Sequence, residues 1–143
     1  MDITPWFSRR RPQLLALLRI IAGLLLLEHG AQKLYKLPIP FPGSLPPLLL
    51  AAGAAELTTG LCVTLGFAAR PAALVGFILS AEMAIGYFVM QFPKGVWVGL
   101  SAGEASILSC AIFLYILAVG PGAWSIDGAR GTERNMRDPS GDL

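Results

Sequence analysis

Four long apolar stretches dominate the chain, separated by short segments rich in proline, glycine or charge. They cover about residues 14–37, 46–67, 72–92 and 100–120. Each stretch holds roughly 20 residues, and a helix of that length crosses a hydrocarbon core of about 30 Å. The breaks contain prolines, which lack the backbone donor that a helix interior needs. The pattern predicts an all-α membrane protein, folded as a bundle of four transmembrane helices.

The four predicted spans form one domain over residues 1–127, and residues 128–143 form a polar tail that we expect to be flexible. Of the 143 residues, 55% are hydrophobic and 14% are charged, whereas soluble domains carry about 25% charge. This composition indicates that the lipid bilayer surrounds the protein and is its main contact partner. The net charge of +2 is too small for a nucleic-acid-binding surface, and no nucleic acid is expected.

Basic residues are distributed unevenly between the two sides of the predicted bundle. Four spans place both termini on one side, together with the turn at Arg70, and that side holds seven arginines. The other side holds three lysines, and Arg19, which lies inside the first span, is not counted. Because excess positive charge marks the cytoplasmic side of a membrane protein, we expect both termini in the cytoplasm.

Ionisable residues inside the spans are the main candidates for function. Such residues are costly in lipid and often mark a binding site or an ion pathway. We predict that seven of them line a polar pocket open to the non-cytoplasmic side: Arg19, Glu28, His29, Lys33, Glu56, Glu82 and Glu104. The alternative is purely structural pairing of these charges, and the Arg19 side chain could instead extend to the membrane surface.

The angular positions of these residues support a polar interior. At 100° per residue, Arg19, Glu28, His29 and Lys33 occupy one half of the first helix, and apolar residues occupy the other half. Glu56 shares its face with small residues that include Gly53 and Gly60. Small residues leave room for a ligand or let helices approach closely, so this face could also join two protomers of a homodimer.

Few residues suit a metal or redox centre. Cys62 and Cys110 lie in different stretches and form no Cys-x-x-Cys motif, so we expect them to pack as small apolar groups. With His29 as the single histidine, neither a zinc site nor a haem site is predicted. No catalytic residue is assigned from the sequence.

Two motifs resemble one protein family. The first span contains Arg19-Ile-Ile-Ala-Gly23 and then Glu28-His-Gly-Ala-Gln-Lys33-Leu34. Later segments read Pro93-Lys-Gly, Gly103-Glu104, and Phe113 to Asp127, which ends in Gly-Pro-Gly-Ala-Trp-Ser-Ile-Asp. Together they are similar to the signatures of the DoxX family over about residues 14–127. Relatives often carry a histidine before Pro-Lys-Gly, where this chain has Gln91-Phe92, which argues against a proton relay through the third span.

The resemblance implies a small multi-pass protein of the bacterial inner (plasma) membrane, in redox or oxidative-stress physiology. Some relatives partner soluble enzymes of thiol and oxidative-stress defence, and the related DoxD proteins are subunits of a thiosulfate:quinone oxidoreductase. We therefore expect a subunit that binds a quinone or a small sulfur compound, rather than a self-sufficient enzyme, with soluble redox partner proteins. The sequence leaves two alternatives open: a small transporter coupled to protons or ions, and a membrane scaffold for soluble redox partners.

Overall fold

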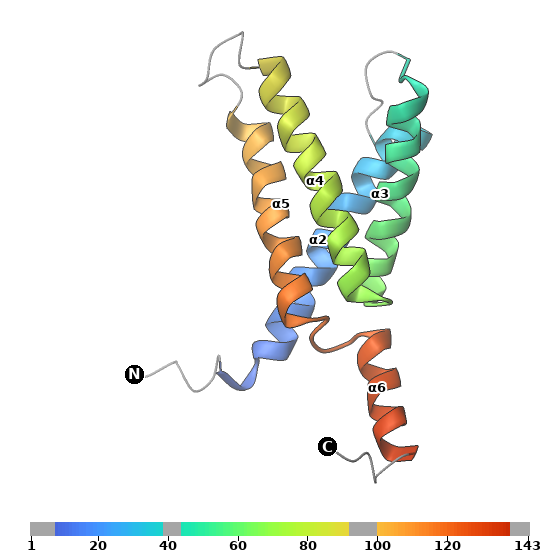
Figure 1. Cartoon of the computed structure of the whole chain (residues 1–143), viewed down its shortest axis with the longest axis vertical. Coiled ribbons are helices and arrows are strands. Elements are labelled where there is room, and N and C mark those ends of the chain that lie inside the picture. The colour runs from blue at the N-terminus through green and yellow to red at the C-terminus, as the bar shows by residue number, and fades with distance from the viewer. Residues whose placement is uncertain (1–7, 39–43, 92–99, 138–143) are drawn as a thin grey trace.

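The computed structural model describes residues 8–38, 44–91 and 100–137, and within them the fold is helical with no strand. The helices are α2 (Arg11–Tyr35), α3 (Pro47–Leu65), α4 (Ala69–Gln91), α5 (Leu100–Val119) and α6 (Ile126–Arg137) (Figure 1). Prolines at the first turns of α2 and α3 suit positions whose N–H groups have no partner within the helix. Gly66, in the left-handed conformation, ends α3.

Three helices are long and apolar enough to cross a membrane: α2, α3 and the stretch Ala69–Val89 of α4. The apolar part of α5 that the structure describes, Ala105–Val119, is shorter. Large apolar side chains cover the outside of the bundle, as lipid contact requires. The helical membrane fold is thus confirmed, and the fourth span stays a prediction.

The helices pack as two pairs, α2 with α3 and α4 with α5, and fewer contacts join the pairs. The pairs cross near the end that carries α6 and diverge toward the opposite end (Figure 1). A small apolar core lies between them, in which Phe113 and Ile116 of α5 meet Val63 of α3 and Ala22 of α2.

Glycines hold α2 and α3 in close backbone contact. A Cβ atom at Gly60 would lie 2.5 Å from the backbone nitrogen of Leu27, and one at Gly30 would lie 2.5 Å from that of Leu57. Only glycine fits such an approach. The face that contains Gly53 and Gly60, which the sequence offered to a ligand, a helix or a second protomer, therefore packs against α2 of the same chain.

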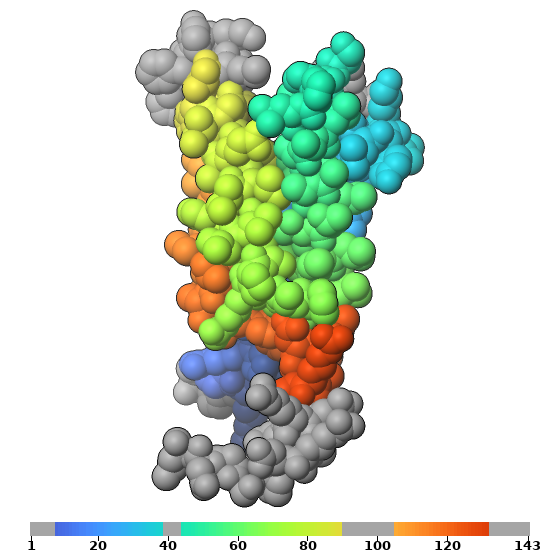
Figure 2. Space-filling model, turned by 45° about the vertical axis from the view of Figure 1, so that its right-hand side comes forward, coloured from blue at the N-terminus to red at the C-terminus, as the bar shows by residue number. Residues whose placement is uncertain are grey.

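The first part of the polar tail is helical. Residues 126–137 form helix α6, while residues 138–143 lie outside the described part, so the expected flexibility of the tail stays a prediction. The first turn of α6 is anchored to the bundle, because the backbone nitrogen of Asp127 donates to the Gly66 carbonyl over 3.0 Å. α6 lies beyond the end of the bundle where α3 turns into α4 (Figure 2).

Candidate functional site

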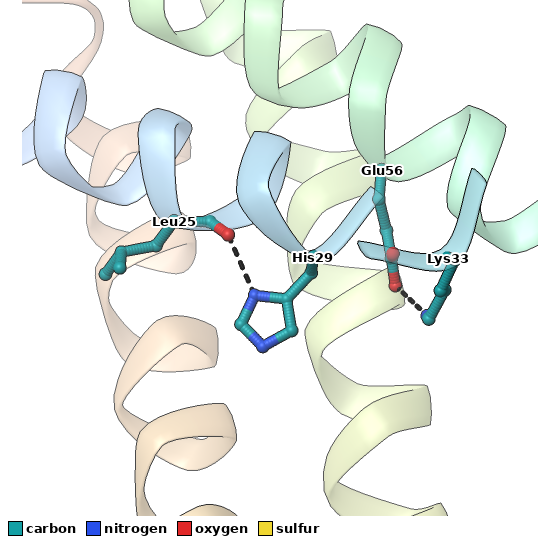
Figure 3. A network of polar contacts seen from close by, with 4 residues as sticks. All are labelled: Leu25, His29, Lys33 and Glu56. Carbon is teal, nitrogen blue, oxygen red and sulfur yellow. Dashed lines mark hydrogen bonds and ion pairs between the residues drawn. The ribbon is translucent and has the colours of Figure 1, made fainter. Parts of the chain in front are cut away.

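Lys33 of α2 and Glu56 of α3 form a buried ion pair, in which the Lys33 ammonium donates to Glu56 Oε1 (Figure 3). The Lys33 side chain is 8% exposed and the Glu56 side chain is 0% exposed. Gly53, one turn before Glu56, gives Lys33 its room, since a Cβ atom there would lie 2.8 Å from Lys33 Cβ. The second oxygen, Glu56 Oε2, is buried and has no hydrogen-bond partner among the described residues.

His29 lies one turn before Lys33 on α2 but makes a different contact. Its Nδ1 atom is 2.8 Å from the Leu25 carbonyl oxygen (Figure 3). A carbonyl only accepts hydrogen bonds, so Nδ1 must carry the proton that is donated. The other ring nitrogen, Nε2, then serves as an acceptor in the neutral imidazole. This arrangement fixes both the tautomer and the orientation of the ring.

The imidazole borders a cavity of about 410 Å³ between α2, α4 and α5. The walls are mostly apolar, and a few polar side chains interrupt them. The polar lining residues are His29, Gln32, Ser80, Tyr87, Ser106 and Ser109. Neither Lys33 nor Glu56 lines this cavity, so the ion pair is not part of the cavity wall.

Arg19 lies near the other end of α2 and takes no part in the cavity. Its side chain is completely buried, and its guanidinium donates to the carbonyls of Pro121 and Trp124, both over 2.8 Å. These bonds tie the first helix to the loop that follows α5. Arg19 therefore does not line the cavity, and its side chain is not exposed at the protein surface.

Asp127 makes further contacts at the same end of the bundle, and we call the contacts of Arg19 and Asp127 together the joint. Its two carboxylate oxygens accept hydrogen bonds from the backbone nitrogens of Ala68 and Ala69, over 2.9 and 2.7 Å, at the start of α4. The carboxylate also attracts the nearby Arg19 guanidinium. These contacts explain the closing sequence motif. Asp127, the last residue of the motif, caps α4, and the carbonyls of Pro121 and Trp124 within the motif accept hydrogen bonds from Arg19.

The remaining glutamates lie apart from these contacts. Glu28 is half-buried on α2, and Glu82 is exposed on α4. Within the described residues neither makes a hydrogen bond or an ion pair. The side chain of Glu104 lies outside the described part of the structure. The six predicted residues that can be placed therefore form several local arrangements rather than one cluster.

Ser80 and Ser106 line the cavity but were missed by the sequence analysis. Both are buried, on α4 and α5 respectively. A serine in an apolar helix can bond to its own backbone, so a single hydroxyl carries no signal of a site. Nor do the described residues include a group of three or more histidine, cysteine, aspartate or glutamate side chains that could hold a metal.

Comparison with known proteins agrees with the motifs. The DoxX family model matches residues 14–91. A Haemophilus influenzae protein, described as uncharacterized, is 36% identical over 127 residues, which is 84% of this chain and 92% of the relative. No solved structure matches the chain. By the family match and this extended similarity, the chain belongs to the DoxX family.

Proposed function

We propose that this protein is a membrane subunit of a redox system and binds a quinone in the cavity between α2, α4 and α5. The observation that carries the proposal is the cavity itself, mostly apolar, about 410 Å³ in volume and bordered by His29. Pockets for small molecules are typically apolar spaces of about 300–1,000 Å³ with a few polar groups that set orientation. A quinone ring has this combination of flat apolar surface and polar carbonyls.

The polar lining residues suit the two forms of such a ligand. The Gln32 amide and the Tyr87 hydroxyl can donate to quinone carbonyls. His29 Nε2, as an acceptor, can take a hydrogen bond from a quinol hydroxyl, because Nδ1 is held by Leu25. A charged sulfur compound suits the cavity less well, since its described lining includes no lysine or arginine.

Electrons would have to come from a partner protein. The free thiols Cys62 and Cys110 lie on α3 and α5, and they form no disulfide. We therefore propose a binding subunit of a quinone-linked oxidoreductase that cooperates with a soluble redox protein. In this proposal the chain spans the bacterial inner membrane four times, with both termini in the cytoplasm, where such a partner would dock.

Quinone binding tests the proposal directly. Calorimetric titration of the protein in lipid nanodiscs with a short-chain benzoquinone, and separately with a naphthoquinone, should give saturable binding. Ser106→Leu places extra volume in the cavity and should abolish binding. Thr58→Leu is the matched control, because the Thr58 hydroxyl is exposed on α3 and bonds only to its own helix.

His29→Ala should weaken binding of the reduced quinol by roughly 2- to 13-fold, the usual worth of one hydrogen bond. Equal affinity of wild type and Ser106→Leu for both quinones would refute the proposal. So would an equal loss of affinity in the Thr58→Leu control, since that residue lies outside the cavity.

A second function, transport coupled to protons or ions, is favoured by one observation. Glu56 Oε2 is buried without a partner, so it could accept a proton beside Lys33. Proteoliposomes with a pH-sensitive dye inside should then show a proton flux that Glu56→Gln removes. Absence of flux in wild-type proteoliposomes, whatever solute is offered, would refute this second function.

A further inference from the structure

A second hollow lies between the first turns of α2 and the last turns of α5. It has a volume of about 750 Å³, and Arg11 stands at its edge on α2. Leu14 and Leu18 of α2 and Tyr115 and Val119 of α5 form its apolar walls. Among the described residues it shares no lining residue with the cavity beside His29, so this inference does not rest on the proposed quinone binding.

The hollow is charged at one end and apolar along its length. Arg11 is the first residue of α2, and seven residues separate it from Leu18, which at 1.5 Å per residue is about 10 Å along the helix. Arg11 is exposed and makes no hydrogen bond or ion pair with the described residues. Its guanidinium is thus available to an external anion.

The position relative to the membrane follows from α2. This helix is a candidate membrane span that begins at Arg11, so in a bilayer Arg11 would lie at the level of the lipid headgroups. The apolar walls then extend into the hydrocarbon region. Leu14, Tyr115 and Val119 are each about half exposed, so these walls face lipid rather than the core.

The shape of the hollow is fixed by the loop after α5. The backbone nitrogen of Ala123 donates to the Pro12 carbonyl over 3.0 Å. Gly122 fits beside it because a Cβ atom there would lie 2.9 Å from the same carbonyl oxygen. The loop therefore holds the ends of α2 and α5 together, and the hollow is a formed groove.

We infer that this groove is a binding site for an anionic phospholipid. The phosphate of the headgroup contacts the Arg11 guanidinium, which can donate two parallel hydrogen bonds to phosphate oxygens. An acyl chain lies along Leu14, Leu18, Tyr115 and Val119. Arg9, also exposed and two residues away, adds to the attraction for an anionic headgroup and disfavours one that carries a net positive charge.

Native mass spectrometry of the protein, released from nanodiscs that contain equal amounts of phosphatidylglycerol and phosphatidylcholine, tests the site. Wild-type protein should retain one phosphatidylglycerol. Arg11→Gln should reduce that occupancy by at least about tenfold, because a hydrogen-bonded charge contact is lost. Arg70→Gln is the matched control: Arg70 is exposed at the start of α4, at the same end of the bundle, but does not line the groove. Its occupancy should equal that of wild type.

Four results would overturn the inference. Equal loss in Arg11→Gln and Arg70→Gln would indicate general attraction to an anionic surface. Equal retention of phosphatidylcholine would show that the headgroup charge is not recognised. Displacement of the retained lipid by millimolar inorganic phosphate would assign a simple anion site, and a lipid-free dimer would assign the groove to a second copy of the chain.

Discussion

The buried pair of Lys33 and Glu56 allows the sharpest test of the described geometry. Two opposite charges about 4 Å apart attract by about 4 kcal/mol at an effective dielectric of about 20. Removing two ions from water costs several kcal/mol each, so the intact pair contributes little net stability. Removing either partner alone should nevertheless destabilise the fold strongly, because the remaining charge would be buried without compensation.

Lys33→Met is the most informative single change. It keeps a long side chain at the position beside Gly53 but leaves both oxygens of Glu56 without a donor in a fully buried site. Breaking a buried pair in this way costs about 3–5 kcal/mol in the free energy of unfolding. Glu56→Gln should cost less, about 1–3 kcal/mol, because the amide oxygen still accepts from Lys33.

The double variant, Lys33→Met with Glu56→Gln, removes both charges and should recover much of the loss. The unfolding free energies of wild type, both single variants and the double variant form a thermodynamic cycle. We expect a coupling of about 2–3 kcal/mol, as found for residues in direct polar contact. The assay is reversible unfolding by sodium dodecyl sulfate in mixed micelles, followed by helical circular dichroism.

Thr58→Val is the control for the cycle, since Thr58 is an exposed polar residue on the same helix and should change stability by less than about 0.5 kcal/mol. If Lys33→Met were as stable as wild type, or if the single losses simply added in the double variant, the pair would not be buried and coupled as described.

Three further predictions concern packing and the joint at the α6 end. Gly60→Ala should cost about 1–3 kcal/mol of unfolding free energy in the same assay, because its Cβ would meet the Leu27 backbone, whereas Gly86→Ala, with nothing within 4 Å, should be neutral. Asp127→Ala should cost about 1–2 kcal/mol through loss of the α4 cap, and Asp127→Asn less; equal losses would argue against capping. Arg19→Met should speed proteolytic cleavage in the loop after α5, and Arg19→Lys should restore only part of the protection; unchanged cleavage would contradict the joint.

The sequence predicted the faces of α2 well but not the partners along it. Arg19 and Lys33 fall on the same polar half of the helix, which suggested one pocket. They are, however, 14 residues apart, about 21 Å along the axis. An angular projection discards that axial distance. One residue therefore meets the loop after α5, and the other meets Glu56 of α3.

The small face of α3 illustrates a similar limit. Gly53 and Gly60 are seven residues apart, as are Gly23 and Gly30 on α2, so each pair lies on one stripe. The spacing predicts close contact with something, but it does not distinguish a ligand, another helix or another protomer. Only the three-dimensional arrangement shows that the two stripes meet each other.

The tail was harder to predict, because residues 126–137 are polar on average and include Gly128 and Gly131, which disfavour a helix. The start of α6 depends instead on contacts distant in sequence, above all Asp127 with the turn between α3 and α4. Serine 125 adds a local cap, since its side-chain oxygen accepts from the Gly128 nitrogen over 3.0 Å.

The joint and the cavity are related through the crossing of the two helix pairs. At the α6 end, Arg19 and Asp127 connect α2, the start of α4 and the loop after α5, so the pairs cannot separate there. Toward the other end the pairs diverge, and the cavity beside His29 lies between them (Figure 1). Releasing the joint should therefore alter the spacing of the helix pairs and, with it, the width of the cavity. We expect Arg19→Met to weaken the proposed quinone binding even though Arg19 lies outside the cavity. Unchanged affinity in a folded Arg19→Met protein would show that the joint and the cavity are not coupled.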